Sequence, residues 1–164
     1  MQNVFTMKFF LFFAILVMVG GCSTQTITFS APKLPLKSGE RIAVFALENY
    51  TQTPQAGKRA ANLIGSRLAA GGFTVVNMID GEAADDNARR ELARKSDAAY
   101  YLDGGVSEWQ YKTGIDGEPA VSLTLRLHDG VSGDTLWSVS GSRSEWGNGS
   151  IGNTAQLLIN ELLR

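Results

Sequence analysis

The sequence predicts an α/β fold: a single, three-layer-like domain in which helices flank a mixed sheet. In the first half of the chain, short apolar runs alternate with segments of helical periodicity, which is the order of strand–helix units. In the second half, three extended segments follow one another with turns between them, which is typical of an antiparallel meander. A last amphipathic segment completes the order as strand, helix, strand, helix, three strands and helix.

The first half contains two strands and two helices. Residues 41–47 form an apolar run without a breaker, which predicts a buried strand. Residues 56–70 place Ala60, Ile64 and Leu68 on one helical face, and the two glycines that follow predict the end of this helix. The other elements expected here are a strand at 73–78 and a short, charged helix at 85–95.

The second half contains the three strands of the expected meander. Residues 98–112 form a long strand candidate, in which Gly104 and Gly105 indicate a bulge. The clearest alternation of apolar and polar side chains runs from Val121 to His128. The return strand is expected at 135–143 and the final amphipathic helix from Ile151 onward.

The N-terminal segment has the order of a secretion signal. Lys8 precedes an apolar run from Phe9 to Val19, and two glycines and Cys22 follow. This ending resembles the lipobox of bacterial lipoproteins, in which the cysteine thiol is acylated. Because Cys22 is the only cysteine, an intramolecular disulfide is excluded and lipid attachment fits best. The alternative is an ordinary cleaved signal with an incidental cysteine.

We therefore expect a signal peptide at 1–21 and a lipidated tether at 22–39, which joins the membrane to a domain at 40–164. Apart from the lipid on Cys22, no cofactor is expected. Serine rather than aspartate follows Cys22. By resemblance to sorted lipoproteins, this residue favours the periplasmic face of the outer membrane.

The charge balance gives no support for nucleic-acid binding. Without the signal, the chain holds 14 basic and 16 acidic residues, a net charge of −2. Residues 96–142 contain seven acidic and only two basic side chains. Such a split is either ordinary solvated surface or the source of opposite fields at two ends of the molecule.

The titratable residues form no catalytic or metal-binding pattern. The single histidine, His128, occupies a polar position of its strand, where we expect it to face solvent. The pair Asp85 and Asp86 is explained by helix capping, and Asp116 and Glu118 by turn chemistry. No metal-ligand spacing, nucleophile elbow or phosphate loop is present. The sequence therefore predicts that the protein is not an enzyme.

The aromatic residues fall into two groups. Tyr101, Trp109 and Tyr111 are an even number of positions apart, so a regular strand would place them on one face. Trp137 lies on the neighbouring strand. We expect Trp109 and Trp137 to pack on a sheet face. Trp146 lies instead in a polar, glycine-rich loop, where it either folds back as a plug or protrudes toward lipid, because tryptophan favours membrane interfaces.

The chain resembles the PelC family, the lipoproteins of Pel exopolysaccharide export, over nearly the whole expected domain. Three segments carry the resemblance: 49–57, 109–121 and 140–147. The second segment is the most specific because it is long and unusual. The core fold of this family resembles the N-terminal domain of TolB, which agrees with the α/β order above.

The resemblance implies a non-enzymatic protein that forms a homo-oligomeric ring, a dodecamer, at the outer membrane. Beside the porin-and-repeat protein PelB, its acidic lumen is expected to guide a cationic, partly deacetylated amino-sugar polymer toward the porin. By the same resemblance, Asp116 and then Glu118 supply acid to the pore, and Trp146 contacts the membrane.

A second class of function stays open. Small TolB-like lipoproteins also dock onto cell-wall synthases and activate them. A regulator of this kind is expected to be a monomer with a protein-binding face, whereas an export protein is expected to be a ring.

Overall fold

A computed structural model describes residues 25–29, 33–81, 83, 85–112, 117–146 and 149–164. Two residues singled out above, Cys22 and Asp116, lie outside this part of the chain. No helix within it has the length and apolar character needed to cross a membrane.

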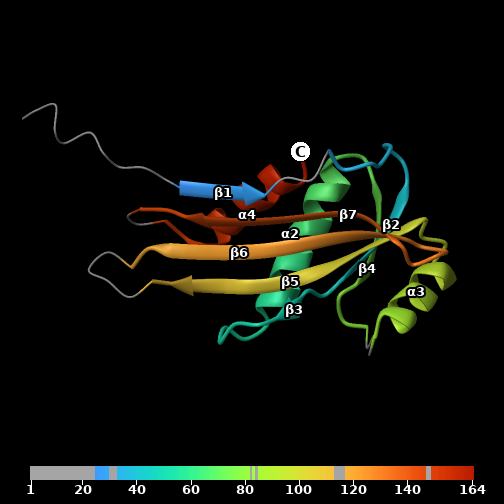
Figure 1. Cartoon of the computed structure of the whole chain (residues 1–164), viewed down its shortest axis with the longest axis horizontal. Helices are drawn as coiled ribbons and strands as arrows, with labels where there is room; N and C mark the ends of the chain where they lie inside the picture. Colours follow the sequence, from blue (N-terminus) through green and yellow to red (C-terminus); the bar gives the residue numbers. More distant parts are fainter. Residues whose placement is uncertain (1–24, 30–32, 82, 84, 113–116, 147–148) are drawn as a thin grey trace, which may run out of the picture.

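Seven strands form one mixed sheet (Figure 1). In order across the sheet they are β1 (Gln25–Phe29), β7 (Thr135–Ser144), β6 (Pro119–Asp129), β5 (Tyr100–Tyr111), β2 (Arg41–Phe45) and β4 (Thr74–Met78), and β3 (Glu48–Asn49) pairs with β5. Strands β1, β7, β6 and β5 are antiparallel, whereas β5, β2 and β4 are parallel. The mixed sheet and the C-terminal meander predicted from the sequence are therefore confirmed.

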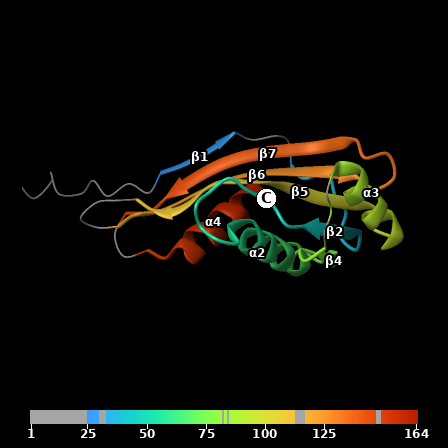
Figure 2. The same ribbon diagram turned by 90° about the horizontal axis from the view of Figure 1, so that it is seen from below.

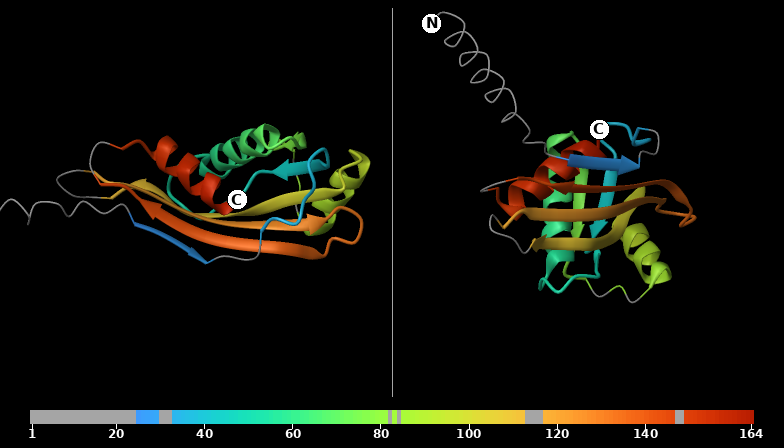
Figure 3. Two further views of the ribbon diagram at one scale, coloured as in Figure 1. Left: turned by 90° about the horizontal axis from the view of Figure 1, so that it is seen from above. Right: turned by 60° about the vertical axis from the view of Figure 1, so that its left-hand side comes forward.

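The helices lie on both faces of the sheet. Helices α2 (Ala56–Ala70) and α4 (Ile151–Leu162) pack together on one face, and α3 (Asp86–Lys95) lies at one end of the molecule (Figures 2 and 3). The main core forms beneath α2 and α4, and a smaller core, which includes Phe45, Ala93 and Tyr101, forms beneath α3. Strand β2 is covered on both sides, because Ile42 and Val44 belong to the main core and Ala43 to the smaller one. The three-layer-like arrangement is thus present around β2.

Part of the segment expected to be a tether belongs to the sheet. Gln25–Phe29 forms β1, which pairs antiparallel with β7 over five residues, from Gln25 opposite Ser144 to Phe29 opposite Ser140. The short extended pieces expected in the tether therefore include a strand that covers the outer edge of β7.

The irregularity in β5 lies beyond the two glycines. The pairing register with β6 shifts between Val106 and Glu108. Beyond this shift, odd-numbered residues face the side of the sheet that even-numbered residues face before it. Tyr101 therefore lies in the core under α3, and Trp109 lies in the main core. The expectation that they share a face is wrong, because a bulge adds one residue to the alternation. Gly104 has a different role: a Cβ on it would lie 1.9 Å from the carbonyl oxygen of Thr124.

Candidate functional site

One end of the sheet, which we call the hairpin end, holds the start of β1, the end of β5, the start of β6 and the end of β7 (Figure 1, left). The register fixes this arrangement, because Ser144 of β7 lies between Gln25 of β1 and Ala120 of β6. Gln25, the first residue of β1, therefore lies at this end.

Glu145 fixes the link between β7 and α4. Its backbone N–H donates to the carbonyl of Pro119 at 3.2 Å, which joins the link to β6. Its carboxylate pairs with Arg143 at 3.2 Å and accepts a hydrogen bond from Thr154 in the first turn of α4 at 3.1 Å. Helix α4 itself begins at a capping serine, because Oγ of Ser150 accepts from the backbone N–H of Asn153.

Trp146 follows this fixed residue, and its side chain is 62% exposed. It therefore does not fold back as a plug. Trp109 and Trp137 are 4% and 6% exposed and belong to the main core, as expected from their strand positions. The three tryptophans thus divide into two buried side chains and one that projects from the hairpin end.

The acidic turn lies at the same end of the sheet as Trp146. The carbonyl of Glu118 accepts a hydrogen bond from the N–H of Lys112 at 2.7 Å, which closes the hairpin next to the first residue of β6. Gly117 has a positive φ of 52°. The second acid of this turn, Asp116, lies outside the described residues. The structure therefore brings Glu118 and Trp146 to one end.

A groove opens between α2 and α4 at the hairpin end, and we call it the α2–α4 groove. It has a volume of about 540 Å³ and is lined by residues from three segments, Thr53–Leu63, Trp109–Tyr111 and Ser150–Gly152. Trp109 is buried in it, whereas Tyr111 is 51% exposed. The sequence does not indicate this groove because its walls are far apart in the chain. The only available signal was the pair Trp109 and Tyr111, whose parity places both on the α2–α4 face.

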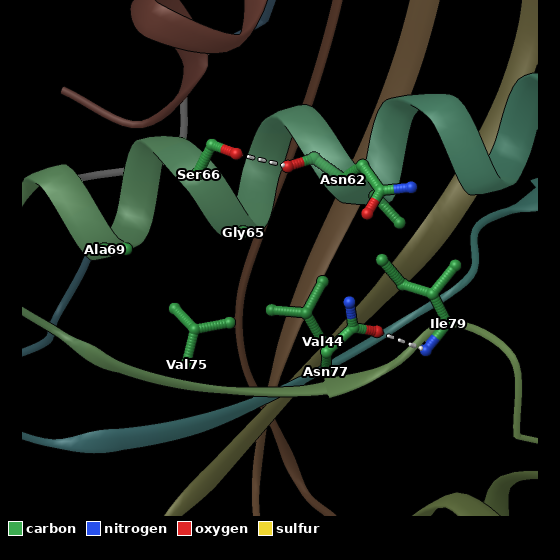
Figure 4. Close-up of a pocket in the computed structure, with 9 residues that line it drawn as sticks. Val44, Asn62, Gly65, Ser66, Ala69, Val75, Asn77 and Ile79 are labelled. Carbon is green, nitrogen blue, oxygen red and sulfur yellow. Dashed lines mark hydrogen bonds between the residues drawn. The ribbon is translucent and has the colours of Figure 1, made fainter.

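Two other hollows have polar groups that bond to the chain itself. One, of about 260 Å³, lies between α2 and β4 (Figure 4). In it Oδ1 of Asn77 accepts from the N–H of Ile79, and the hydroxyl of Ser66 donates to the carbonyl of Asn62. The other lies on the opposite face of the sheet, where the hydroxyls of Ser122 and Ser142 bond to each other at 2.9 Å.

Asp103 is the centre of a charge cluster at the α3 end of the sheet. It is 1% exposed. Its carboxylate accepts a hydrogen bond from Nε of Arg126 at 2.9 Å and lies 3.6 Å from Nη1 of Arg89. The bond to Asp103 is the main cause that raises the pKa of Arg126. The hydrogen bond from Tyr50, with the charge of Arg89, lowers the pKa of Glu48.

His128 belongs to this cluster and does not face solvent. It is 6% exposed, its ring stacks on Tyr101 with centroids 4.5 Å apart, and its Nε2 lies 3.2 Å from Oδ1 of Asp103. The hydroxyl of Thr135 is 3.2 Å from its Nδ1. The expectation of a solvent-facing histidine is wrong because α3 covers this end of the polar sheet face. Every polar contact of the ring is made within the protein, which indicates a structural role.

Helix capping explains the first acidic pair, as expected. Oδ1 of Asp85 accepts from the backbone N–H of Ala88 at 2.8 Å at the start of α3. Within the described ranges, no group of three histidine, cysteine or acidic side chains is placed to hold a metal ion.

Comparisons with known proteins agree with this fold. The chain matches no protein-family model and no curated protein. Among solved structures it is similar to a PelC dodecamer from Paraburkholderia phytofirmans in two crystal forms. One match has 38% identity and a TM-score of 0.73, the other 34% and 0.69, and both cover 86% of this chain and 96% of that one. A lipoprotein of Neisseria meningitidis, 20% identical with a TM-score of 0.54 over 74% of this chain and 96% of that chain, shares the fold.

The fold and these likenesses define a class of small α/β proteins in which helices flank a mixed sheet. Within that class, the chain belongs to the PelC family, because the identity exceeds 30% over most of both chains. PelC is a non-enzymatic export lipoprotein, so family membership agrees with the prediction that this chain is not an enzyme.

Proposed function

We propose that the protein is one subunit of a homo-oligomeric ring, a dodecamer, that guides Pel exopolysaccharide to its porin, PelB. The ring is anchored by lipid on Cys22 to the periplasmic face of the outer membrane. Its lumen is acidic and attracts a cationic, partly deacetylated amino-sugar polymer. The observation that carries the proposal is the 34–38% identity to PelC dodecamers over 86% of the chain.

The hairpin end supports a specific orientation of the subunit. The start of β1, Trp146 and the acidic turn all lie there. The anchor and the tryptophan therefore direct the hairpin end toward the bilayer. The acidic turn of each subunit then faces the periplasm or lines the lumen, where the cationic polymer arrives.

The proposed mechanism is electrostatic focusing. Asp116 and Glu118 recur once in every subunit, so the ring concentrates negative charge at its opening and raises the local concentration of a cationic polymer. Each contact must stay weak, because a tightly bound polymer would stop moving. We expect salt to weaken the capture, since screening acts within about 8–10 Å at physiological ionic strength.

The direct test combines Asp116→Asn with Glu118→Gln in full-length protein and measures exported polymer and the mass of the assembly. We expect export to fall severalfold while the ring mass stays unchanged. The matched control combines Asp80→Asn with Glu91→Gln, which also removes two solvent-accessible carboxylates. Unchanged export with an intact ring would exclude these carboxylates as guides.

The competing function, a monomeric regulator of a cell-wall synthase, is distinguished by the same mass measurement. The chain is similar to the C-terminal domain of LpoB from Salmonella enterica at 18% identity and a TM-score of 0.52, which shows a common fold alone. A stable monomer at high concentration, in detergent as well as without it, would contradict the ring.

A further inference from the structure

We propose that the α2–α4 groove is a subsite for one uncharged, N-acetylated sugar residue of the exported polymer. This inference rests on the proposed function, because that function supplies the polymer. It assigns the neutral units of the polymer to the groove and leaves the charged units to the acidic turn.

The size and walls of the groove fit a single sugar ring with its substituents. Its volume of about 540 Å³ lies in the range of small-molecule sites, which are mostly apolar with a few polar groups. Leu63, Trp109, Tyr111 and Ile151 supply apolar surface. An aromatic ring offers a flat apolar face, and the C–H face of a sugar ring is complementary to it.

Tyr111 is held in place although half of it is exposed. Its hydroxyl oxygen accepts a hydrogen bond from the backbone N–H of Ile151 at 3.4 Å, at the start of α4. The hydroxyl of Thr53 donates to the carbonyl of Trp109, which ties the loop before α2 to the same part of β5. The aromatic wall is therefore fixed by the start of α4 and by the loop before α2 before a ligand arrives, and little conformational entropy is lost on binding.

Arg59 decides which sugar the groove accepts. It lines the groove from the first turns of α2, and its side chain has no hydrogen bond or ion pair with any described residue. The guanidinium is permanently charged and only donates hydrogen bonds. It therefore repels the ammonium group of a deacetylated unit and can donate to the carbonyl oxygen of an acetamido group. Asn62 lies on the same wall, but its Nδ2 donates to the carbonyl of Lys58 at 3.1 Å, so Arg59 is the side chain that remains available to a ligand.

The groove and the acidic turn are adjacent in the chain and in space. Tyr111 lines the groove, and the next residue, Lys112, bonds through its N–H to Glu118. A partly deacetylated polymer that crosses the hairpin end therefore meets a site for neutral units and a site for cationic units together. Neither of the two other hollows is lined by a residue next to this turn.

The test measures binding of two defined probes to the full-length lipidated protein in detergent by calorimetry. The probes are the N-acetylglucosamine tetramer and its fully deacetylated counterpart, and both are measured at physiological salt on protein carrying Asp116→Asn and Glu118→Gln, so that the acidic turn is neutral while the charge of Arg59 is kept. We expect the acetylated probe to bind at least about tenfold more tightly, a difference of about 1.4 kcal/mol. No binding of the acetylated probe, or equal binding of both probes, would overturn the proposal.

Variants locate the site. Tyr111→Ala is expected to weaken binding of the acetylated probe about tenfold, Tyr111→Phe to retain most of it, and Arg59→Ala to reduce the preference for acetylated sugar. The control is Tyr50→Ala, because Tyr50 is 69% exposed but lies over Gly105, outside the groove. Tyr50→Ala must leave binding unchanged; an equal loss in both alanine variants overturns the assignment.

The mass of each variant separates this inference from its main rival. If Tyr111→Ala changes the mass of the assembly, the groove is a contact between copies and the sugar site is wrong. An intact ring that exports polymer but binds neither probe refutes the subsite alone. A monomer that still binds the acetylated probe refutes the ring and supports the subsite.

Discussion

The two ends of the sheet use their polar side chains in opposite ways. At the α3 end, Asp103 and His128 are buried, and they bond to Arg126 and to each other. At the hairpin end, Glu145 is also bonded internally, but Trp146 follows it and is largely exposed. Asp103 and Glu145 are both internally bonded acids, but they support different features. Asp103 holds a closed charge cluster, whereas Glu145 fixes the backbone from which Trp146 projects.

This difference indicates which end carries function. Charged side chains that pair with one another inside the fold have few hydrogen bonds left for a partner. The exposed side chains of Trp146 and Arg59 remain available for binding. The comparison predicts that substitutions at the α3 end reduce stability, and that substitutions at the hairpin end reduce binding and leave the fold intact.

The largest expected effect is that of Asp103→Ala. The substitution leaves Arg126, Arg89 and His128 without their shared partner, and removing one member of a buried charge cluster costs about 3 kcal/mol. Urea unfolding measures this loss. The control is Asp80→Ala, whose ion pair with Lys58 is exposed and is expected to contribute less than about 0.5 kcal/mol. Equal stability of the two variants would mean that the cluster does not hold the α3 end together.

Trp146→Ala should have the converse effect. Because the side chain is 62% exposed, we expect a stability change within about 0.5 kcal/mol. Binding of the full chain without lipid, made with Cys22→Ser, to phospholipid vesicles should fall about tenfold per subunit, since burial of a large apolar side chain contributes about 1.5 kcal/mol or more. Trp146→Phe should retain most of the binding. Unchanged sedimentation of Trp146→Ala with vesicles would count against membrane contact.

The smallest effect concerns pH and the turn between β6 and β7 at the α3 end. Hydrogen bonds from the backbone N–H groups of Ser132 and Val131 lower the pKa of Asp129. A lowered pKa in the folded state stabilises the fold above the unfolded value of about 3.9, and this contribution is lost as pH falls through the folded value.

We therefore expect Asp129→Asn to flatten the loss of stability below about pH 4. At pH 7 the variant should lose less than about 1 kcal/mol. Unfolding midpoints in urea between pH 2 and pH 7 measure both quantities. A variant with the same acid dependence as the unchanged protein would show that this turn does not contribute to it.

Elements with a regular period could be predicted from the sequence, and pairings across distant segments could not. The helix over 56–70 has the predicted bounds because a full apolar face and two terminal glycines determine it locally. The bulge was misplaced because its position depends on the register with β6. The burial of His128 was missed because its partners, Tyr101 and Asp103, come from another strand.

The same reason explains how much of the site could be predicted. The exposure of Trp146 follows from a local pattern, an aromatic residue in a polar loop rich in glycine. The α2–α4 groove does not, because Arg59, Tyr111 and Ile151 come from three elements that only the fold brings together.

The pairing of β1 with β7 also has a mechanical consequence. In the proposed ring, a polymer that moves through the lumen would drag on the subunits and lipid on Cys22 would resist that drag, so tension would enter the domain at Gln25. Because β1 runs along β7 over five residue pairs, a pull along the strand axis loads all of these pairs together. Such a shear load resists rupture far better than peeling one pair at a time. In the proposed ring, β1 would therefore carry force between the domain and its lipid anchor without separating from β7 one pair at a time.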